Sequence, residues 1–349
     1  MLTDARPVAS VSLDVDDLWT YLRTHGDPAW ERRPSYLAAF VPAVLDALDE
    51  AGATITFFLV GEDAARDADA GRLRALAERG HEIANHTFGH DVWMQAYGEA
   101  AADEEIARAE AAIEAATGRR PAGFRGPGFS WGPPLLRVLA RRGYRYDAST
   151  LPTFVGPLAR RYFLATARLT PAERAERAAL FGSFGDGLRP NRPYRWALGN
   201  GLELLELPVT TVPGARTPFH LSYLMYLAGY SERVMFGYLR GALALCRATG
   251  TEPSFLLHPL DLLGAGEAPG LEFFPGMALG AARKRRLFVR VLRVLGEHFA
   301  LVPMAAHAER AGRGPLPRRA PDRESGGRPP SVAPAPLAPA PHQKPSHAS

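Results

Sequence analysis

Short segments typical of buried strands alternate along this chain with segments typical of helices, and the alternation limits the available folds. Strands are expected at residues 8–15, 53–60, 81–84 and 144–147, and the segment 53–60 is rich in β-branched and aromatic residues. Helical patterns, most of them followed by a glycine, lie between them at residues 34–51, 69–79, 99–117 and 133–142. Strands that alternate with helices of this length form βαβ crossovers, so we expect an α/β fold with a parallel sheet.

The alternation stops at residue 149 and resumes at residue 202. Residues 149–201 are rich in Arg, Pro and aromatic side chains, with one helix expected at 171–181, and we interpret them as an insertion. Later elements are expected as strands at 202–209, 254–258 and 300–303, and as helices at 223–249 (broken near 229–231) and 284–298. One folded domain is expected over residues 1–309. Residues 310–349 are rich in Pro, Ala and Arg, which predicts a disordered tail.

The charge and cysteine content exclude some classes of protein. The net charge of +4 belongs to the tail, because residues 310–349 hold seven Lys or Arg against two Asp or Glu. The rest of the chain is nearly neutral, so nucleic-acid binding is not expected. Cys246 is the single cysteine, which excludes an intramolecular disulfide. No signal-peptide pattern opens the sequence, and we expect a cytoplasmic protein.

Three carboxylates follow the first apolar run, at Asp14, Asp16 and Asp17. The carboxyl ends of parallel strands are where α/β folds place their active sites. The run could also be an acidic turn that caps the next helix. Residues 18–33 are expected to form a loop rich in aromatic and charged side chains.

Two histidines, His86 and His90, are four residues apart, and His81 lies just upstream. This spacing would place both imidazoles on one face of a helical turn, close enough to hold one metal ion. A catalytic zinc site needs three protein ligands and an open position. The third ligand must therefore come from elsewhere, and the N-terminal carboxylates are the obvious source.

Four motifs in order resemble those of the polysaccharide deacetylase family (NodB homology, carbohydrate esterase family 4). They are the acidic residues 14–17, the strand 54–61 followed by residues 80–90, the Arg125 motif at 124–129 and the strand 255–258 that ends in His258. The resemblance covers roughly residues 8–305. It implies a distorted (β/α) barrel with about seven parallel strands. It also implies a metal-dependent hydrolase that removes an N-acyl group, typically N-acetyl, from an amino sugar or glycan precursor.

The resemblance also implies roles for individual residues. One aspartate is the general base, and a second binds the metal with His86 and His90. Strand alternation makes Asp14 the base and Asp16 the ligand. A gapless alignment with the adjacent pair that is commoner in the family would instead make Asp16 the base and Asp17 the ligand. Both assignments stay open at this point.

Two further roles come from the later motifs. Arg125 matches the arginine that orients the catalytic carboxylate, and His258 matches the general acid. The family's usual Asp-Trp motif, which holds the acid histidine, is not evident here. Glu206 or Asp261 could take its place, and Asp147, at the end of a strand, is a pocket candidate.

The resemblance favours Zn²⁺ as the metal, although Co²⁺, Ni²⁺ or Mn²⁺ suit the same ligands. The expected partner is an N-acylated sugar or glycan. Residues 162–164, the apolar residues 223–245 and the basic helix 284–293 could together contact a membrane or a lipid-linked substrate. Two alternatives remain, a catalytically inactive carbohydrate-binding protein on the same fold and a metal-dependent hydrolase of a non-sugar amide.

Overall fold

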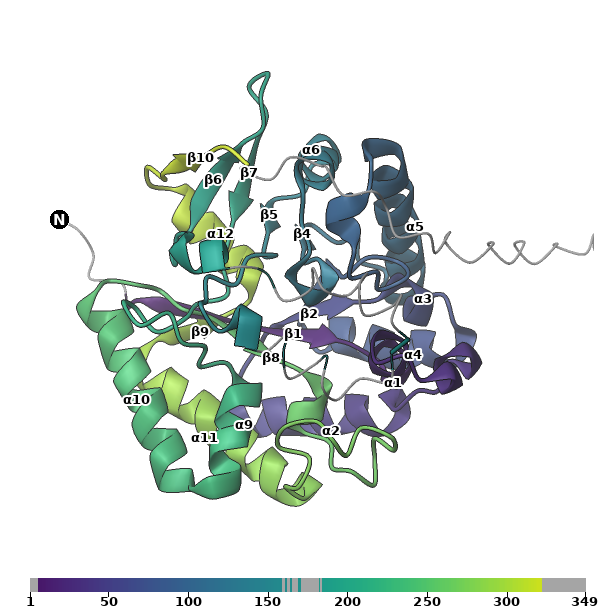
Figure 1. The fold of residues 1–349 in the computed structure, drawn as a ribbon, viewed down its shortest axis with the longest axis vertical. Helices are drawn as coiled ribbons and strands as arrows, with labels where there is room; N and C mark the ends of the chain where they lie inside the picture. Colours follow the sequence, from purple (N-terminus) through teal and green to yellow (C-terminus); the bar gives the residue numbers. More distant parts are fainter. Residues whose placement is uncertain are drawn as a thin grey trace, which may run out of the picture.

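The computed structural model describes residues 6–158, 161, 164, 169–170, 182 and 184–321 (Figure 1). The strands are β1 (Val8–Val15), β2 (Thr56–Leu59), β3 (Glu82–Asn85), β4 (Gly123–Phe124), β5 (Tyr146–Asp147), β6 (Tyr194–Ala197), β7 (Glu203–Glu206), β8 (Ser254–Leu257), β9 (Ala300–Val302) and β10 (Arg318–Arg319). The α-helices are α1 (Leu18–Thr24), α2 (Leu37–Ala51), α3 (Gly61–Ala64), α4 (Asp67–Glu78), α5 (Glu99–Thr117), α6 (Pro133–Arg141), α9 (Leu221–Tyr230), α10 (Glu232–Ala248), α11 (Ala281–His298) and α12 (Met304–Gly312). Short 3₁₀ turns are η1 (Pro28–Arg32), η2 (Met94–Ala96), η3 (Pro127–Phe129), η4 (Phe184–Leu188) and η5 (Pro259–Asp261).

Seven parallel strands form one row, in the order β7-β5-β4-β3-β2-β1-β8, and β9 pairs parallel with the start of β1. Hydrogen bonds connect the two ends of this row just beyond β7. The Thr210 N–H donates to the Ser254 carbonyl at 3.0 Å, and the Ser254 N–H donates to Thr210 Oγ1 at 2.8 Å. The sheet is thereby closed into a distorted barrel, and the predicted α/β barrel of about seven parallel strands is confirmed.

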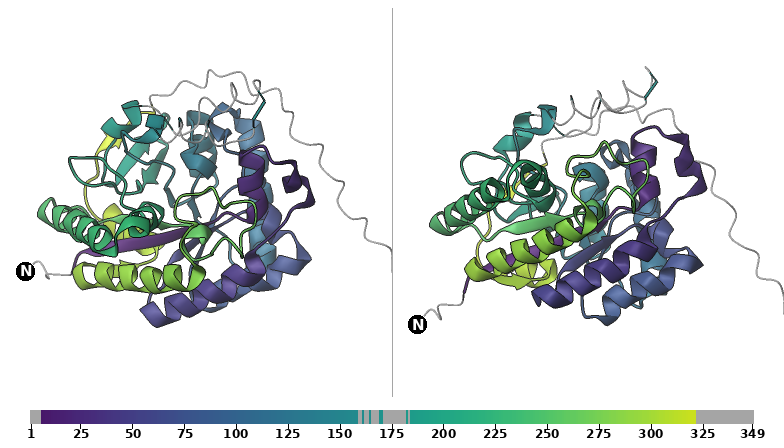
Figure 2. Two further views of the ribbon diagram at one scale, coloured as in Figure 1. Left: turned by 60° about the horizontal axis from the view of Figure 1, so that its bottom comes forward. Right: turned by 90° about the horizontal axis from the view of Figure 1, so that it is seen from below.

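Strand β1 crosses the centre of the molecule (Figure 1). All eight of its residues are buried, with β2 on one side and β8 on the other. Helices α10, α11, α2, α4, α5 and α6 lie around the outside of the strands, and each contacts the next in this order (Figure 2). Apolar side chains at positions 9, 11, 13 and 15 alternate along the strand with the buried polar side chains of Ser10, Ser12 and Asp14.

The expected loop over residues 18–33 is wrong, because this stretch forms α1 and η1. The Asp17 carboxylate caps α1 by accepting a hydrogen bond from the Leu18 N–H at 2.8 Å. Trp19 and Leu22 pack their side chains into the interior. The helix places its buried face against the carboxyl end of β1, beside the acidic residues.

Two strands extend the sheet beyond the barrel. Strand β6 lies inside the predicted insertion and pairs antiparallel with β7, and β10 pairs with β6. The predicted boundary at residue 310 is therefore wrong, because α12 continues to Gly312 and β10 is part of the sheet. The helix expected at 171–181 and the tail from residue 322 lie outside the described residues.

The apolar region 223–249 forms two helices, and the expected break is confirmed at Ser231, whose side chain caps α10. Among the helices that the structure describes, none combines the length and the apolar character needed to cross a bilayer.

Candidate metal and catalytic site

The residues singled out from the motifs gather at the carboxyl ends of neighbouring strands. Asp14 and Asp16 lie at the end of β1, and His86 and His90 follow β3. Arg125 comes directly after β4, and His258 directly after β8. The register pairs Leu13 with Leu257, so Asp14 and His258 are the next residues on two adjacent strands. Parallel strands place these ends on one edge of the barrel, as active sites of such folds require.

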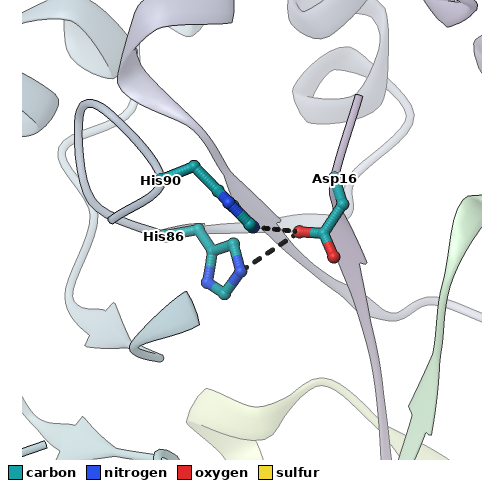
Figure 3. A group of neighbouring side chains, drawn as sticks. All are labelled: Asp16, His86 and His90. Atoms are coloured by element: carbon teal, nitrogen blue, oxygen red, sulfur yellow. Dashed lines mark hydrogen bonds and ion pairs between the residues drawn. The ribbon is translucent and has the colours of Figure 1, made fainter. Parts of the chain in front are cut away.

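Asp16, His86 and His90 form a compact cluster that fits a metal ion (Figure 3). Both imidazole Nε2 atoms converge on the same carboxylate oxygen, Asp16 Oδ1, at 3.2 Å from His86 and 3.0 Å from His90. Ligand atoms held 2.0–2.1 Å from a tetrahedral zinc ion lie about 3.3 Å apart. Two of the three distances between the candidate ligand atoms therefore match those around a zinc ion, and all three atoms lie within 4.8 Å of one another.

The two histidines are placed by a loop, and the expected helical turn is wrong. Thr87 and His90 have positive φ angles of 66° and 52°, which no helix contains. The loop is held by the Glu105 carboxylate, which accepts hydrogen bonds from the N–H groups of Phe88 at 3.0 Å and Gly89 at 2.6 Å. The two imidazole rings therefore meet across a loop, and Glu105 on α5 holds this loop in place.

His86 is also oriented from behind. Its Nδ1 lies 2.7 Å from the Arg125 carbonyl oxygen, so Nδ1 carries a proton and Nε2 is the nitrogen that faces Asp16. His81 stays outside the cluster, since its Nδ1 accepts a hydrogen bond from the Ile55 N–H at 3.2 Å.

The charges in the cluster favour an ionised carboxylate. Burial raises the pKa of Asp16, but the charge of His90 and the hydrogen bonds from His86 and His90 outweigh it, so the pKa is well below the usual value. Burial lowers the pKa of His86, whereas the carboxylates of Asp14 and Asp16 raise it, and the net pKa is above the usual value. A divalent cation would take the place of protons in this negatively charged site.

Asp14 lies beside the cluster and is bound by Arg125. The guanidinium Nη1 donates to Asp14 Oδ1 at 2.6 Å and to Ser12 Oγ at 3.0 Å, while Nε donates to the Ala148 carbonyl at 3.0 Å. Arg125 is completely buried, with its charge over the Phe58 ring at 4.3 Å. The position of the Asp14 carboxylate is therefore fixed, and it lies outside the group of metal-binding atoms.

Asp17, the alternative ligand, turns away from the cluster. Its oxygens accept hydrogen bonds from the N–H groups of Leu18 at 2.8 Å and Tyr36 at 2.9 Å, and from Arg66 Nη2 at 2.8 Å. The geometry therefore supports the assignment of Asp14 as base and Asp16 as ligand. Of the three carboxylates in the acidic turn, Asp17 is the one that caps a helix.

His258 has a different partner from the one expected. Its Nδ1 lies 3.1 Å from the hydroxyl of Ser222, and its backbone N–H donates to Asp261 Oδ2 at 2.8 Å. The prediction that Glu206 orients His258 is wrong. Its carboxylate instead accepts hydrogen bonds from Thr150 Oγ1 at 2.6 Å and Trp196 Nε1 at 2.9 Å.

Glu206 is paired with Asp147 across two strands, because the register of β5 and β7 makes them neighbours. Burial raises the pKa of Asp147 to about 6, and burial together with the charge of Asp147 raises the pKa of Glu206 well above its usual value. Two buried carboxyls in contact share a proton. This pair lies within the interior and is a separate group from the candidate ligands.

Two neighbours of the site were missed from the sequence, Tyr21 and Ser222. The Tyr21 phenol lies beside the Asp16 carboxylate, and burial followed by the charges of Asp16, Asp261 and Asp14 raises its pKa well above the usual value. It therefore stays a neutral hydrogen-bond donor. The cap at Asp17 could have indicated Tyr21, four residues later on the same helical face. No local pattern indicates Ser222.

Residues 5–146 match the family described as polysaccharide deacetylase. This part of the chain resembles that family. The match includes Asp14, Asp16, His86, His90 and Arg125, whereas His258, Ser222 and Asp261 lie beyond it. The enzyme class of the family is a hydrolase of carbon–nitrogen bonds. No curated protein matches the chain significantly.

Solved structures share the fold of this chain. A putative polysaccharide deacetylase from Mycobacterium smegmatis is 22% identical, with a TM-score of 0.55, over 93% of this chain and 99% of the other. A probable polysaccharide deacetylase from Pseudomonas aeruginosa is 18% identical, with a TM-score of 0.53, over 88% and 91%. An allantoinase is 17% identical, with a TM-score of 0.54, over 88% and 91%. These similarities extend the fold assignment through the C-terminal half.

Proposed function

We propose that this protein is a metal-dependent deacylase that removes an N-acyl group, typically N-acetyl, from an amino sugar or glycan precursor. The observation that carries the proposal is the convergence of His86 and His90 on one oxygen of Asp16, with the fixed carboxylate of Asp14 beside them. These three ligands leave coordination positions open. Zn²⁺ is the preferred ion for two imidazoles and one carboxylate, and Co²⁺, Ni²⁺ or Mn²⁺ suit the same set.

Each step of the hydrolysis has a candidate residue. The bound metal would supply Lewis acidity, which makes water more acidic and the acyl carbonyl more electrophilic. Asp14 accepts a proton from the attacking water, and Arg125 holds the Asp14 carboxylate in position. His258 donates a proton to the amine nitrogen as the C–N bond breaks. The products are the carboxylic acid and the free amino group.

The substrate class is tested with a panel of compounds that includes both acetylated sugars and a non-sugar amide. The protein is treated with a chelator, reloaded with each of the four metals, and given N-acetylglucosamine, its oligomers and allantoin. Release of acetate together with a free amine from the sugars supports the proposal. Hydrolysis of allantoin alone would instead support the alternative of a non-sugar amide. Absence of any hydrolysis by a metal-loaded protein would support the inactive carbohydrate-binding alternative.

Matched variants show whether the site residues act as proposed. Asp14→Asn should abolish hydrolysis while metal remains bound, whereas Asp46→Asn, an exposed aspartate of α2, should have no effect. His90→Ala should lose both metal and hydrolysis, whereas His298→Ala, at the far end of α11, should keep both.

Contact with a membrane or a lipid-linked substrate remains part of the proposal. The exposed side chains of Tyr226, Tyr230 and Val234 on α9 and α10 support it. Lys284 does not, because it is buried and donates to the Leu260 carbonyl at 2.7 Å. Flotation with liposomes of neutral and anionic lipid tests this part, and recovery of the protein only in the bottom fraction with both compositions would exclude it.

A further inference from the structure

We propose that Lys284 is a positioning residue that holds the general acid His258 in place through one peptide group, the group that joins Leu260 to Asp261. This inference rests on the proposed function, because it concerns the same general acid. It gives a role in the reaction to a buried ammonium on α11 that none of the four motifs contains.

Lys284 is buried in a place where a lysine is costly, and every donor of its ammonium has a partner. Its side chain is 1% exposed. Nζ donates to the Leu260 carbonyl at 2.7 Å, to the Leu263 carbonyl at 2.8 Å and to Met277 Sδ at 3.2 Å. A buried ammonium is stable only where its three N–H groups are satisfied in this way. Lys284 therefore binds the turn that follows β8 at two points.

The peptide group between Leu260 and Asp261 connects this ammonium to the general acid. The Leu260 carbonyl accepts from Lys284 at one end of the group. At the other end, the Asp261 N–H donates to the His258 carbonyl at 3.0 Å and also caps the His258 side chain. Because a peptide group is planar, the direction of its carbonyl sets the direction of its N–H. Lys284 thus determines where the N–H meets His258.

His258 is held by two further contacts from the same side of the site. Asp261 Oδ2 accepts from the His258 N–H at 2.8 Å, which completes the capping box. Ser222 Oγ lies 3.1 Å from Nδ1, so Nε2 is the nitrogen left for the leaving amine. A general acid must come within about 2.6–3.2 Å of the atom that it protonates. A turn that loses its ammonium would no longer hold Nε2 at this distance.

Substrates that differ in their leaving groups test this role. An amine leaves only after protonation, whereas the p-nitrophenolate of p-nitrophenyl acetate leaves without a proton. Lys284→Met replaces the ammonium with an apolar side chain of similar length, which suits a buried position. It should lower kcat for N-acetylglucosamine oligomers about tenfold with KM unchanged, and should change hydrolysis of p-nitrophenyl acetate by less than about twofold. His258→Gln should show the same selectivity with a larger loss.

Two other variants accompany this test. Lys284→Gln is too short to reach both carbonyls, so it should show the same selective loss with a different side chain in the site. Arg286→Met removes an exposed positive charge from the same helix and should leave both substrates unaffected. An equal loss for amide and ester in both Lys284 variants would indicate a general structural defect and overturn the inference. Unchanged amide hydrolysis in both variants would overturn it as well.

The NMR signals of the histidine rings test the same contact without turnover. The signal of His258 in the zinc-loaded protein is assigned by its loss in His258→Gln. It should shift in Lys284→Met and stay in place in Arg286→Met. An unchanged His258 signal in Lys284→Met would overturn the inference. If the wild-type protein hydrolyses no acylated sugar, the proposed function fails, while this spectrum still decides whether Lys284 holds His258.

Discussion

The buried pair of Asp14 and Arg125 gives a quantitative prediction about stability. Arg125→Met removes a fully buried guanidinium and leaves the Asp14 carboxylate, itself 4% exposed, without its partner at 2.6 Å. Loss of one member of a buried ion pair costs about 3–5 kcal/mol, because the remaining charge stays desolvated. We expect this loss in the free energy of unfolding of the chelator-treated protein.

Asp14→Asn should cost less, about 1–3 kcal/mol, because the amide oxygen still accepts from Arg125 and the guanidinium keeps Ser12 and the Ala148 carbonyl. The double variant of Arg125→Met and Asp14→Asn leaves no unpaired charge. Its loss should therefore be smaller than the sum of the two single losses by at least about 1 kcal/mol.

Urea unfolding followed by circular dichroism measures these differences, with chelator present so that metal binding does not contribute. Arg119→Met, at an exposed position after α5, is the control and should change the free energy of unfolding by less than about 0.5 kcal/mol. Losses that add within about 0.5 kcal/mol would refute the reasoning, since the two charges would then not depend on each other.

Two other predictions separate residues that the sequence places side by side. Asp17→Ala should lower the free energy of unfolding by about 1–3 kcal/mol, because α1 loses its cap and Arg66 loses a partner. This variant should still bind the metal, whereas Asp16→Ala should lose it. Metal analysis after dialysis distinguishes them, and metal loss from the Asp17 variant would contradict the assignment. For the pair of Asp147 and Glu206, burial raises the pKa of both carboxyls, that of Asp147 to about 6. The folded state therefore holds protons that the unfolded state has released, and stability falls as the pH rises from about 4 to above 6. Glu206→Gln should reduce this fall by about 1–3 kcal/mol between pH 4.5 and 7.5 in urea titrations, and an unchanged pH dependence would mean that the pair does not share a proton.

The first strand and its acidic end could be predicted from local sequence because both depend on neighbouring residues. The structure has β1 at Val8–Val15 as expected, since apolar residues alternate with Ser10, Ser12 and Asp14 along it. The same alternation places Asp14 and Asp16 on one side and Asp17 on the other. The alternative of an acidic turn that caps a helix is confirmed at Asp17, and residues 18–33, which were expected as a loop, begin with the helix that it caps.

Other features depend on contacts between distant segments, and local patterns do not contain them. The spacing of His86 and His90 is compatible with a helix, but the bonds from Glu105 on α5 fix a loop with positive φ angles instead. Glu206 was assigned to His258 before the order of strands was known, and the pairing of β5 with β7 gives it Asp147 as its neighbour. Ser222 lies in an otherwise apolar helix, and its contact with His258 spans 36 residues of sequence.

The most direct test of the central claim is the metal content of the purified protein, measured by elemental analysis after incubation with zinc and removal of the unbound ion. The wild-type protein and His298→Ala should each hold about one ion per chain. His90→Ala should hold none, because Asp16 and His86 alone offer two ligands where a stable site needs three. Equal metal in His90→Ala and the wild type, or no metal in any of the three proteins, would contradict the account of the site.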